Sequence, residues 1–206
     1  MNTKYFITGI GTGIGKTVTS AILTQYFKAD YWKPVQSGDL DRSDSMLVSK
    51  FNNENIDVHP ERYRLKYPAS PHQSAAMENI EIKVRDFELP DTENILLTEG
   101  AGGLFVPLNN TEFMIDLITH LNVPVILVVR DYLGCINHTL LSVEALRSRD
   151  IEIAFVVLNG NFVAETKEII LKHIPSGTKV IELPELDILS KESIQKAADI
   201  VQQQLK

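Results

Sequence analysis

The sequence predicts an α/β protein with a doubly wound, mostly parallel sheet, and three observations support this prediction. Short apolar runs recur along the 206 residues, segments of helical periodicity lie between and after them, and the first run leads into a glycine-rich turn. Continuous apolar runs rich in Val and Ile are typical of strands buried on both faces of a parallel sheet. Alternation of strand and helix favours the doubly wound arrangement. We expect residues 1–206 to form a single domain, since no repeat or low-complexity tract divides them.

Four strands are predicted from the apolar runs. Their expected ranges are Tyr5–Thr8, Ile95–Thr98, Val123–Val129 and Ile153–Leu158. A further strand is expected before a helix that begins at Asp44. The middle of the chain, 52–94, is polar and interrupted by prolines, and its basic stretch RYRLK at 62–66 is interpreted as the solvated face of a strand.

Helices are predicted between and after these strands. The clearest pattern covers 194–205, where the apolar residues share one helical face and are Ile194, Ala198, Val201 and Leu205. Similar patterns predict helices over 137–149 and 163–173, and another helix should follow the glycine-rich turn.

Composition and charge limit the possible partners and compartments. The formal net charge is −7, which argues against unspecific binding of nucleic acid. The only cysteine, Cys135, leaves no internal disulfide framework and suits a reducing cytoplasm. The start, MNTKYF, lacks the features of a signal peptide, and no stretch approaches the roughly 18 to 20 apolar residues of a membrane span. We therefore expect a cytoplasmic protein without membrane segments.

The glycine-rich turn predicts a site for a nucleoside triphosphate. It lies in FITGIGTGIGKTVTSAIL, residues 6–23, between an apolar run and a helical pattern. In such a turn backbone N–H groups face inward and the following helix adds its positive end, which together bind phosphate. Lys16 can then bridge the β- and γ-phosphates, and the hydroxyl of Thr17 can bind Mg²⁺. The strict pattern G-x-x-x-x-G-K-[ST] would need glycine where Ile10 stands, so the loop is a variant. The alternative is a tight turn with an incidental surface lysine.

Two acidic residues are candidates for binding the same magnesium ion. Mg²⁺ usually takes one or two protein carboxylates beside phosphate oxygens and water. Asp44 opens the predicted helix, and Glu99 follows the run NILLT and precedes GAGG. Glu99 should lie beside the glycine-rich turn, because ligands bind outside the carboxyl ends of parallel strands. The alternatives are a helix-capping acid at Asp44 and an ordinary surface charge at Glu99.

A series of motifs resembles the dethiobiotin synthetase family. The series is GIGTGIGKT, WKPVQSG at 32–38, RSD at 42–44, SPH at 70–72, TEGAGGLFVPL at 98–108 and LGCINH at 133–138. It follows the order of the family over at least the first two thirds of the chain. The resemblance implies a homodimeric, Mg²⁺-dependent ligase with a P-loop α/β fold. Such a ligase converts 7,8-diaminopelargonate, CO2 and ATP into dethiobiotin, ADP and phosphate through a carbamate and a carbamic–phosphoric anhydride.

The resemblance also implies roles for individual residues. Those implied to bind ATP are Gly13, Ile14, Gly15, Lys16, Thr17, Val18, Asp44, Glu99, Gly100, Ala101, Gly102, Asn159, Gly160, Pro184, Glu185 and Leu186. Those implied to bind the diamine substrate are Thr12, Lys33, Ser37, Gly134, Cys135 and Asn137, the last three from across the dimer interface. Lys33, Lys16 and Thr12 are implied to be catalytic, and Thr17, Asp44 and Glu99 to bind the metal.

The chain departs from the family pattern at a few places. Well-studied members often carry an acid at the position of Gly13, so any contact of that side chain is absent here. The stretch 80–94 looks shorter than usual, and the carboxyl-terminal third, including 184–186, diverges most.

Other residues allow competing interpretations. Cys135 could be a nucleophile, but nothing near it in the sequence indicates a lowered pKa. His72 and His138 could be general bases or could pack and hydrogen-bond locally, and Trp32 is interpreted as part of the core or of a pocket wall.

Three other functions share a phosphate-binding loop. A partitioning or switch ATPase would carry lysine where Gly11 stands, and a guanine-specific GTPase would continue from Asn159 with a Lys and an Asp that are not there. A small-molecule kinase is compatible with the loop and would differ by releasing a phosphorylated product.

Overall fold

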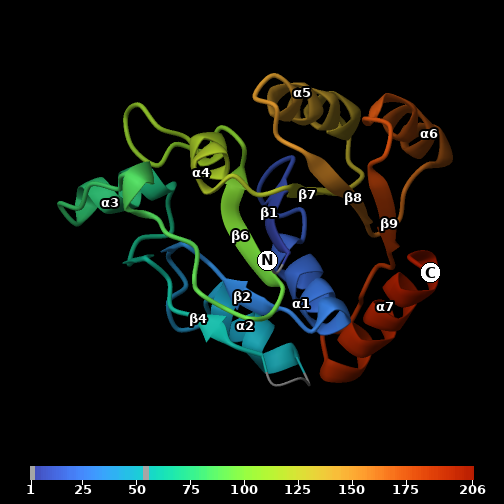
Figure 1. Ribbon diagram of the computed structural model, residues 1–206, viewed down its shortest axis with the longest axis horizontal. Coiled ribbons are helices and arrows are strands. Elements are labelled where there is room, and N and C mark those ends of the chain that lie inside the picture. Colours follow the sequence, from blue (N-terminus) through green and yellow to red (C-terminus); the bar gives the residue numbers. More distant parts are fainter. Residues whose placement is uncertain (1–2, 53–55) are drawn as a thin grey trace.

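A parallel sheet of seven strands lies at the centre of the computed structural model, which describes residues 3–52 and 56–206 (Figure 1). The strands are β1 Lys4–Gly9, β2 Asp30–Trp32, β4 Val58–His59, β6 Leu96–Gly103, β7 Val125–Val129, β8 Ile153–Asn159 and β9 Lys179–Leu183. Their order in the sheet is β4-β2-β6-β1-β7-β8-β9. Every neighbouring pair in this sheet runs parallel, which confirms the predicted fold class.

Helices cover both faces of the sheet. They are α1 Lys16–Phe27, α2 Asp44–Phe51, α3 Pro71–Met77, α4 Met114–Leu121, α5 Cys135–Arg147, α6 Ala164–His173 and α7 Lys191–Gln204. In Figure 1, α1, α2 and α7 lie on one side of the sheet, and α4, α5 and α6 lie on the other. The helix α1 packs against both α2 and α7. This arrangement confirms the doubly wound prediction, and the helices start and end within about one turn of the predicted ranges.

The strand around Glu99 is longer than predicted. We expected it to close at Glu99, but β6 continues through Gly103 because it stays paired with β1. The glycines after Glu99 allow this close approach. A Cβ atom on Gly100 would lie 2.7 Å from the ring of Phe6, and one on Gly103 would lie 3.3 Å from the carbonyl oxygen of Gly9.

The middle of the chain forms a small lobe beside the sheet. Two short parallel strands, β3 Val35–Ser37 and β5 Tyr63–Leu65, pair with each other. The side chain of Leu65 is fully buried whereas Arg64 is exposed, so the interpretation of 62–66 as a solvated strand face is confirmed for its basic residues. Between α3 and β6, a stretch that the structure describes throughout, the chain forms a single 3₁₀ turn, η1 Val84–Asp86.

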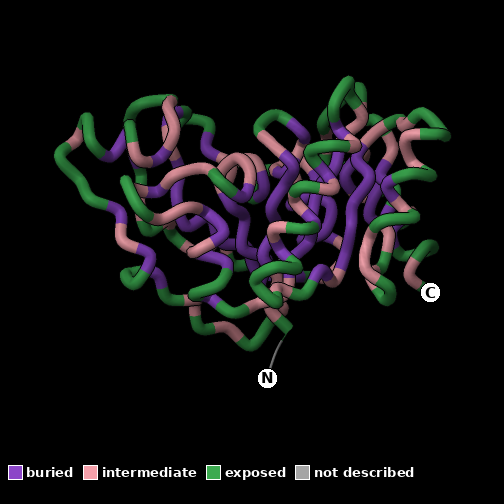
Figure 2. Tube along the Cα trace, turned by 90° about the horizontal axis from the view of Figure 1, so that it is seen from above, coloured by how far each residue is buried: buried purple, intermediate pink, exposed green. Residues whose placement is uncertain are grey.

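Buried side chains concentrate along the strands. Figure 2 shows the buried segments gathered in the interior of the molecule, with exposed segments around the outside. The strand β7 is buried at every residue, as expected for a central strand covered on both faces. Within the described part of the chain, no helix has the length and apolar character needed to cross a membrane.

Candidate functional site

The glycine-rich turn connects the end of β1 to the start of α1, as predicted. Gly13 and Gly15 adopt φ angles of 74° and 84°, which side-chain-bearing residues rarely adopt. A Cβ atom on Gly15 would lie 2.1 Å from Nδ2 of Asn159, so only glycine fits there. Asn159, at the end of β8, donates from Nδ2 to the carbonyl oxygen of Ile14 at 2.8 Å. The turn is therefore held by a strand that lies far away in the sequence.

Lys16 begins α1 and folds back over the turn. Its Nζ donates to the carbonyl oxygen of Gly11 at 3.0 Å, and the residue is buried. Burial lowers the pKa of Lys16 to about 8, although the nearby carboxylate of Glu99 opposes this shift. A phosphate group at the turn would favour the charged form of this lysine.

Three oxygen-bearing side chains from different elements meet next to Lys16. The hydroxyl of Thr17 donates to Oδ1 of Asp44 at 2.7 Å and approaches Oε1 of Glu99 at 3.2 Å. Hydroxyl and carboxylate oxygens are the donors that Mg²⁺ prefers. The described residues contain no cluster of three or more His, Cys, Asp or Glu side chains suited to a metal. This donor set instead fits a magnesium ion that completes its coordination with phosphate oxygens and water.

Lys33 bridges the two carboxylates of this cluster. Its Nζ lies 2.6 Å from Oδ2 of Asp44 and 3.0 Å from Oε1 of Glu99, and it also donates to the carbonyl oxygen of Gly100 at 3.2 Å. Burial alone would lower the pKa of Lys33, but the two carboxylates outweigh burial and raise it. Burial likewise would raise the pKa of Asp44, but the attraction of Lys33 lowers it. The cluster is therefore built from charged groups that compensate one another.

Three further side chains support the carboxylates and were not predicted from the sequence. The hydroxyls of Ser20 and Tyr31 donate to Oε2 of Glu99 at 2.6 and 2.9 Å. Gln36 accepts from the backbone N–H of Asp44 at 3.2 Å. The sequence signal for two of them is spacing. Tyr31 lies two residues before Lys33, which directly follows β2 and shares its face, and Ser20 lies three residues after Thr17, on the same face of a helix.

A polar cavity of about 710 Å³ contains most of the predicted site. The predicted residues that line it are Thr12, Gly13, Gly15, Lys16, Thr17, Val18, Lys33, Ser37, Asp44, Glu99, Ala101 and Gly102. The hydroxyl oxygen of Ser37 is buried and has no hydrogen-bond partner among the described residues. Ser37 as a residue nevertheless lines the polar cavity.

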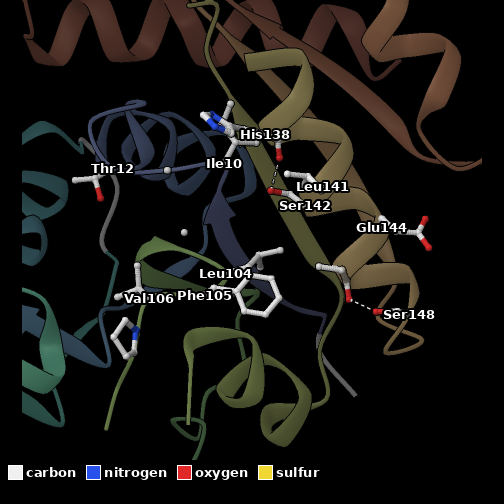
Figure 3. Close-up of a pocket in the computed structure, with 14 residues that line it drawn as sticks. Ile10, Thr12, Leu104, Phe105, Val106, His138, Leu141, Ser142, Glu144 and Ser148 are labelled. Carbon is white, nitrogen blue, oxygen red and sulfur yellow. Dashed lines mark hydrogen bonds between the residues drawn. The ribbon is translucent and has the colours of Figure 1, made fainter. Parts of the chain in front are cut away.

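A second, largely apolar cavity of about 670 Å³ adjoins the first (Figure 3). Thr12 and Val106 line both cavities. Figure 3 shows Leu104 and Phe105 on one side of the second cavity and Leu141 of α5 on the other. A polar compartment and an apolar compartment therefore share a wall.

Two groups of predicted residues lie outside the polar cavity. Gly134, Cys135 and Asn137 stand at the start of α5, and the thiol of Cys135 donates to Asp131. Burial raises the pKa of the Cys135 thiol, which argues against a nucleophilic thiolate, as expected from the sequence.

The second group lies at the carboxyl ends of β8 and β9 and consists of Gly160, Pro184, Glu185 and Leu186. Glu185 pairs with Arg130 at 2.7 Å, and a Cβ atom on Gly160 would lie 2.4 Å from its carboxylate. This segment therefore packs beside the strand that holds the glycine-rich turn.

His72, His138 and Trp32, the other residues singled out in the sequence, make local contacts that account for their presence. Nδ1 of His72 lies 2.9 Å from Oγ of Ser70, and Nδ1 of His138 lies 2.7 Å from the hydroxyl of Tyr132. Trp32 is buried in the core, as interpreted from the sequence. These contacts favour structural roles over general-base roles for the two histidines.

Comparison with known proteins gives close relatives. A family model described as an AAA domain matches residues 3–193. The ATP-dependent dethiobiotin synthetase BioD of Cytophaga hutchinsonii is 49% identical over 180 residues, which cover 86% of this chain and 86% of that protein. The protein of the same name from Brucella ovis is 44% identical over 195 residues, which cover 94% of this chain and 92% of that protein.

Solved structures share the fold at much lower identity. A ParA family ATPase from Chlorobium tepidum TLS superposes with a TM-score of 0.57 at 13% identity and covers 100% of this chain and 98% of that chain. A chain of the MinC:MinD cell division protein complex from Aquifex aeolicus gives a TM-score of 0.53 at 16% identity, covering 98% and 96% of the two chains. At these identities the likeness shows the fold alone.

Proposed function

The chain belongs to the family of ATP-dependent dethiobiotin synthetases, ligases of biotin biosynthesis, and from this membership we propose how its two cavities carry out the reaction. The substrates are 7,8-diaminopelargonate, CO2 and ATP. One amine takes up CO2 as a carbamate, the carbamate is phosphorylated by ATP, and the second amine closes the cyclic urea with release of phosphate.

The polar cavity binds ATP in this proposal. The backbone of Gly13–Val18 holds the phosphates, with the backbone of 100–102 alongside them, and Thr17, Asp44 and Glu99 hold Mg²⁺. The ion would neutralise charge on the phosphates. The 2.7 Å contact between Thr17 and Asp44 and the 3.2 Å contact between Thr17 and Glu99 support this assignment, because they bring the three oxygen donors together. The adenine base of ATP then lies beside Asn159, Gly160 and the segment 184–186.

Lys33 and Lys16 stabilise negative charge at the reacting groups. Phosphoryl transfer needs alignment and charge stabilisation more than it needs a covalent nucleophile. The buried ammonium of Lys33 and the hydroxyl of Thr12 line the same cavity as the glycine-rich turn, which suits an anionic carbamate. Because both amines belong to one molecule, ring closure is intramolecular. Good orientation of the reacting groups can lower the activation barrier of such a step by about 7 to 11 kcal/mol.

The substrate chain extends from the polar cavity towards the apolar one. Ser37 contacts the diamine end, and the apolar cavity beyond Thr12 suits an aliphatic chain. We assign the carboxylate end to Gly134, Cys135 and Asn137 of a second copy in a homodimer. Exposed apolar side chains at Leu133, Leu141 and Phe105 support a contact between copies on this side of the molecule.

The cytoplasm is the proposed compartment. The single cysteine favours a reducing environment. The net charge of −7 argues against a role in nucleic-acid binding.

The observation that carries this proposal is the position of the Lys33 ammonium, which lies 2.6 Å from Asp44 and 3.0 Å from Glu99 in the cavity beside the glycine-rich turn. The test is incubation of the purified protein with labelled bicarbonate, ATP, Mg²⁺ and 7,8-diaminopelargonate. We expect an acid-stable, labelled cyclic urea together with free phosphate. If the product is instead a phosphorylated diamine without label, the protein is a small-molecule kinase.

A further inference from the structure

The two carboxylate oxygens of Glu99 have different surroundings. Oε1 faces the polar cavity, where it accepts from Lys33 at 3.0 Å and from Thr17 at 3.2 Å. Oε2 accepts from the hydroxyls of Ser20 at 2.6 Å and Tyr31 at 2.9 Å. Ser20 and Tyr31 are both fully buried, so their hydroxyls have no competing contact with bulk water.

This asymmetry follows from how two elements approach β6. The strand β2 pairs in parallel with β6, with Tyr31 opposite Leu97. Side chains two residues apart in extended chain point to the same face, so Tyr31 of β2 and Lys33, the residue after β2, both reach Glu99. On α1, Thr17 and Ser20 are three residues apart and share a face. Each element therefore supplies one group to Oε1 and one hydroxyl to Oε2.

We propose that Tyr31 and Ser20 are positioning residues that hold Oε2 of Glu99, so that Glu99 presents only Oε1 to the magnesium ion. This inference rests on the proposed function for the role of the metal. A carboxylate with two free oxygens can rotate or bind a cation through both of them, whereas two buried donors on one oxygen fix its plane. Hydrogen-bond partners of metal-binding carboxylates of this kind affect metal affinity without touching the metal.

The test is metal binding by the Tyr31→Phe variant, which loses only the hydroxyl. Mn²⁺ replaces Mg²⁺ as a paramagnetic probe, and its binding to the complex of the protein with ADP is measured by electron paramagnetic resonance. We expect Mn²⁺ to bind about tenfold more weakly, at the lower end of the effect of such partners because Ser20 remains. Ser20→Ala should weaken binding in the same direction, and at saturating Mg²⁺ the turnover of Tyr31→Phe should recover.

Tyr5→Phe is the matched control. The ring of Tyr5 packs on Phe27 and Phe155 at the start of β1, so loss of its hydroxyl should leave Mn²⁺ affinity unchanged. Thermal unfolding of each variant reports on the fold. The proposal is overturned if Tyr31→Phe binds Mn²⁺ with an affinity within twofold of that of the unaltered protein. This holds even if the unfolding temperature of the variant falls.

The outcome is independent of the overall reaction, since Mn²⁺ and ADP bind without the diamine. If the unaltered protein fails to form the labelled urea but Tyr31→Phe still loses Mn²⁺ affinity, the proposed function is wrong and the positioning role stands. If the urea forms and the affinity does not change, the positioning role is wrong and the function stands.

Discussion

Lys33 illustrates how a single buried side chain can serve both stability and chemistry. Its ammonium is within 3.0 Å of the carboxylates of Asp44 and Glu99, which we propose as metal ligands, and all three groups line the polar cavity. Removing one member of a buried ionic cluster leaves the others uncompensated, which costs about 3 to 5 kcal/mol in typical cases. The same ammonium is the group we assign to the carbamate.

Lys33→Ala should therefore lose both turnover and stability. We expect turnover to fall by at least about tenfold, since hydrogen bonds to charged groups contribute roughly 1.5 to 3 kcal/mol. Added Mg²⁺ should restore part of the lost stability, because a cation can again lie between Asp44 and Glu99. Steady-state kinetics and thermal unfolding with and without Mg²⁺ check both expectations. Lys50→Ala, at an exposed position of α2, serves as the control. Near-normal turnover in Lys33→Ala would remove its catalytic assignment.

Lys16→Ala should act on nucleotide binding. Loss of a charge-assisted contact to phosphate should weaken ATP binding by about 1.5 to 3 kcal/mol, which calorimetric titration measures. The fold should be kept, since the side chain of Lys16 donates to a backbone carbonyl, that of Gly11, and to no carboxylate within the described residues. Unchanged ATP affinity would contradict the phosphate-binding role of the turn.

At the scale of elements, Gln36 connects β3 to α2. Its Oε1 accepts from the backbone N–H of Asp44, and its Nε2 donates to the carbonyl oxygen of Gly38 at 3.0 Å. One amide thus spans the loop that delivers Asp44 to the site. Gln36→Met keeps much of the side-chain volume and removes both hydrogen bonds. We expect a loss of about 1 to 2 kcal/mol in the free energy of unfolding and a higher Mg²⁺ concentration for half-maximal activity. If the half-maximal Mg²⁺ concentration stays the same, the amide does not position Asp44.

Asp30 is the first residue of β2, at the end of the strand away from the polar cavity, and it connects β2 to the segments before β4 and β6. Its carboxylate accepts from the backbone N–H of Asp57, from the hydroxyl of Thr92 and from Nδ2 of Asn94. Burial alone would raise the pKa of Asp30, but these hydrogen bonds outweigh it and lower the pKa. A lowered pKa in the folded state means that the unfolded chain binds more protons, so this stabilisation is present above the ordinary pKa of aspartate and is lost as the pH falls below it.

Asp30→Asn should be less stable than the unaltered protein at pH 7, by about 1 to 3 kcal/mol. The difference should shrink as the pH falls below about 4, because the unfolded chain then takes up a proton at Asp30 while the folded protein still holds the carboxylate charged. Urea unfolding at a series of pH values measures both trends. A difference that stays constant down to pH 2 would contradict the assigned role of the charge.

The elements that were predicted correctly carry strong local signals, whereas the groups that were missed carry at most a weak spacing signal. Glycine spacing predicted the turn around Lys16, and continuous apolar runs predicted the central strands. Tyr31 and Gln36 were missed because their roles depend on which distant segment lies beside them. The predicted end of β6 was wrong because glycine by itself is unfavourable in a strand. In this protein the close contact of these glycines with β1 extends the strand.

At the scale of the whole molecule, the face formed by α5 and the segment after β6 is the proposed contact between two copies. Leu141 is 60% exposed and Phe105 is 59% exposed, and both line the apolar cavity. Large exposed apolar side chains around a cavity are typical of interaction sites.

Leu141→Glu should convert the proposed dimer into monomers, because a charge would be buried at the contact. Light scattering coupled to gel filtration measures the mass. We also expect activity to fall, since the start of α5 would no longer reach the site of the other copy. Ile169→Glu, which places the same charge on exposed α6, should remain dimeric. A monomeric mass for the unaltered protein would remove the dimer from the proposal.

The three residues of β2 alternate in direction, so Tyr31 and the following Lys33 can reach Glu99 only in one alignment with β6. The hydrogen bonds of Asp30 set that alignment from the far end of the sheet. An extra residue inserted between Asp30 and Tyr31 would move the following side chains to the opposite face, so the ammonium of Lys33 would point away from Glu99. The number of residues between Asp30 and Lys33 is thus itself a requirement of the site.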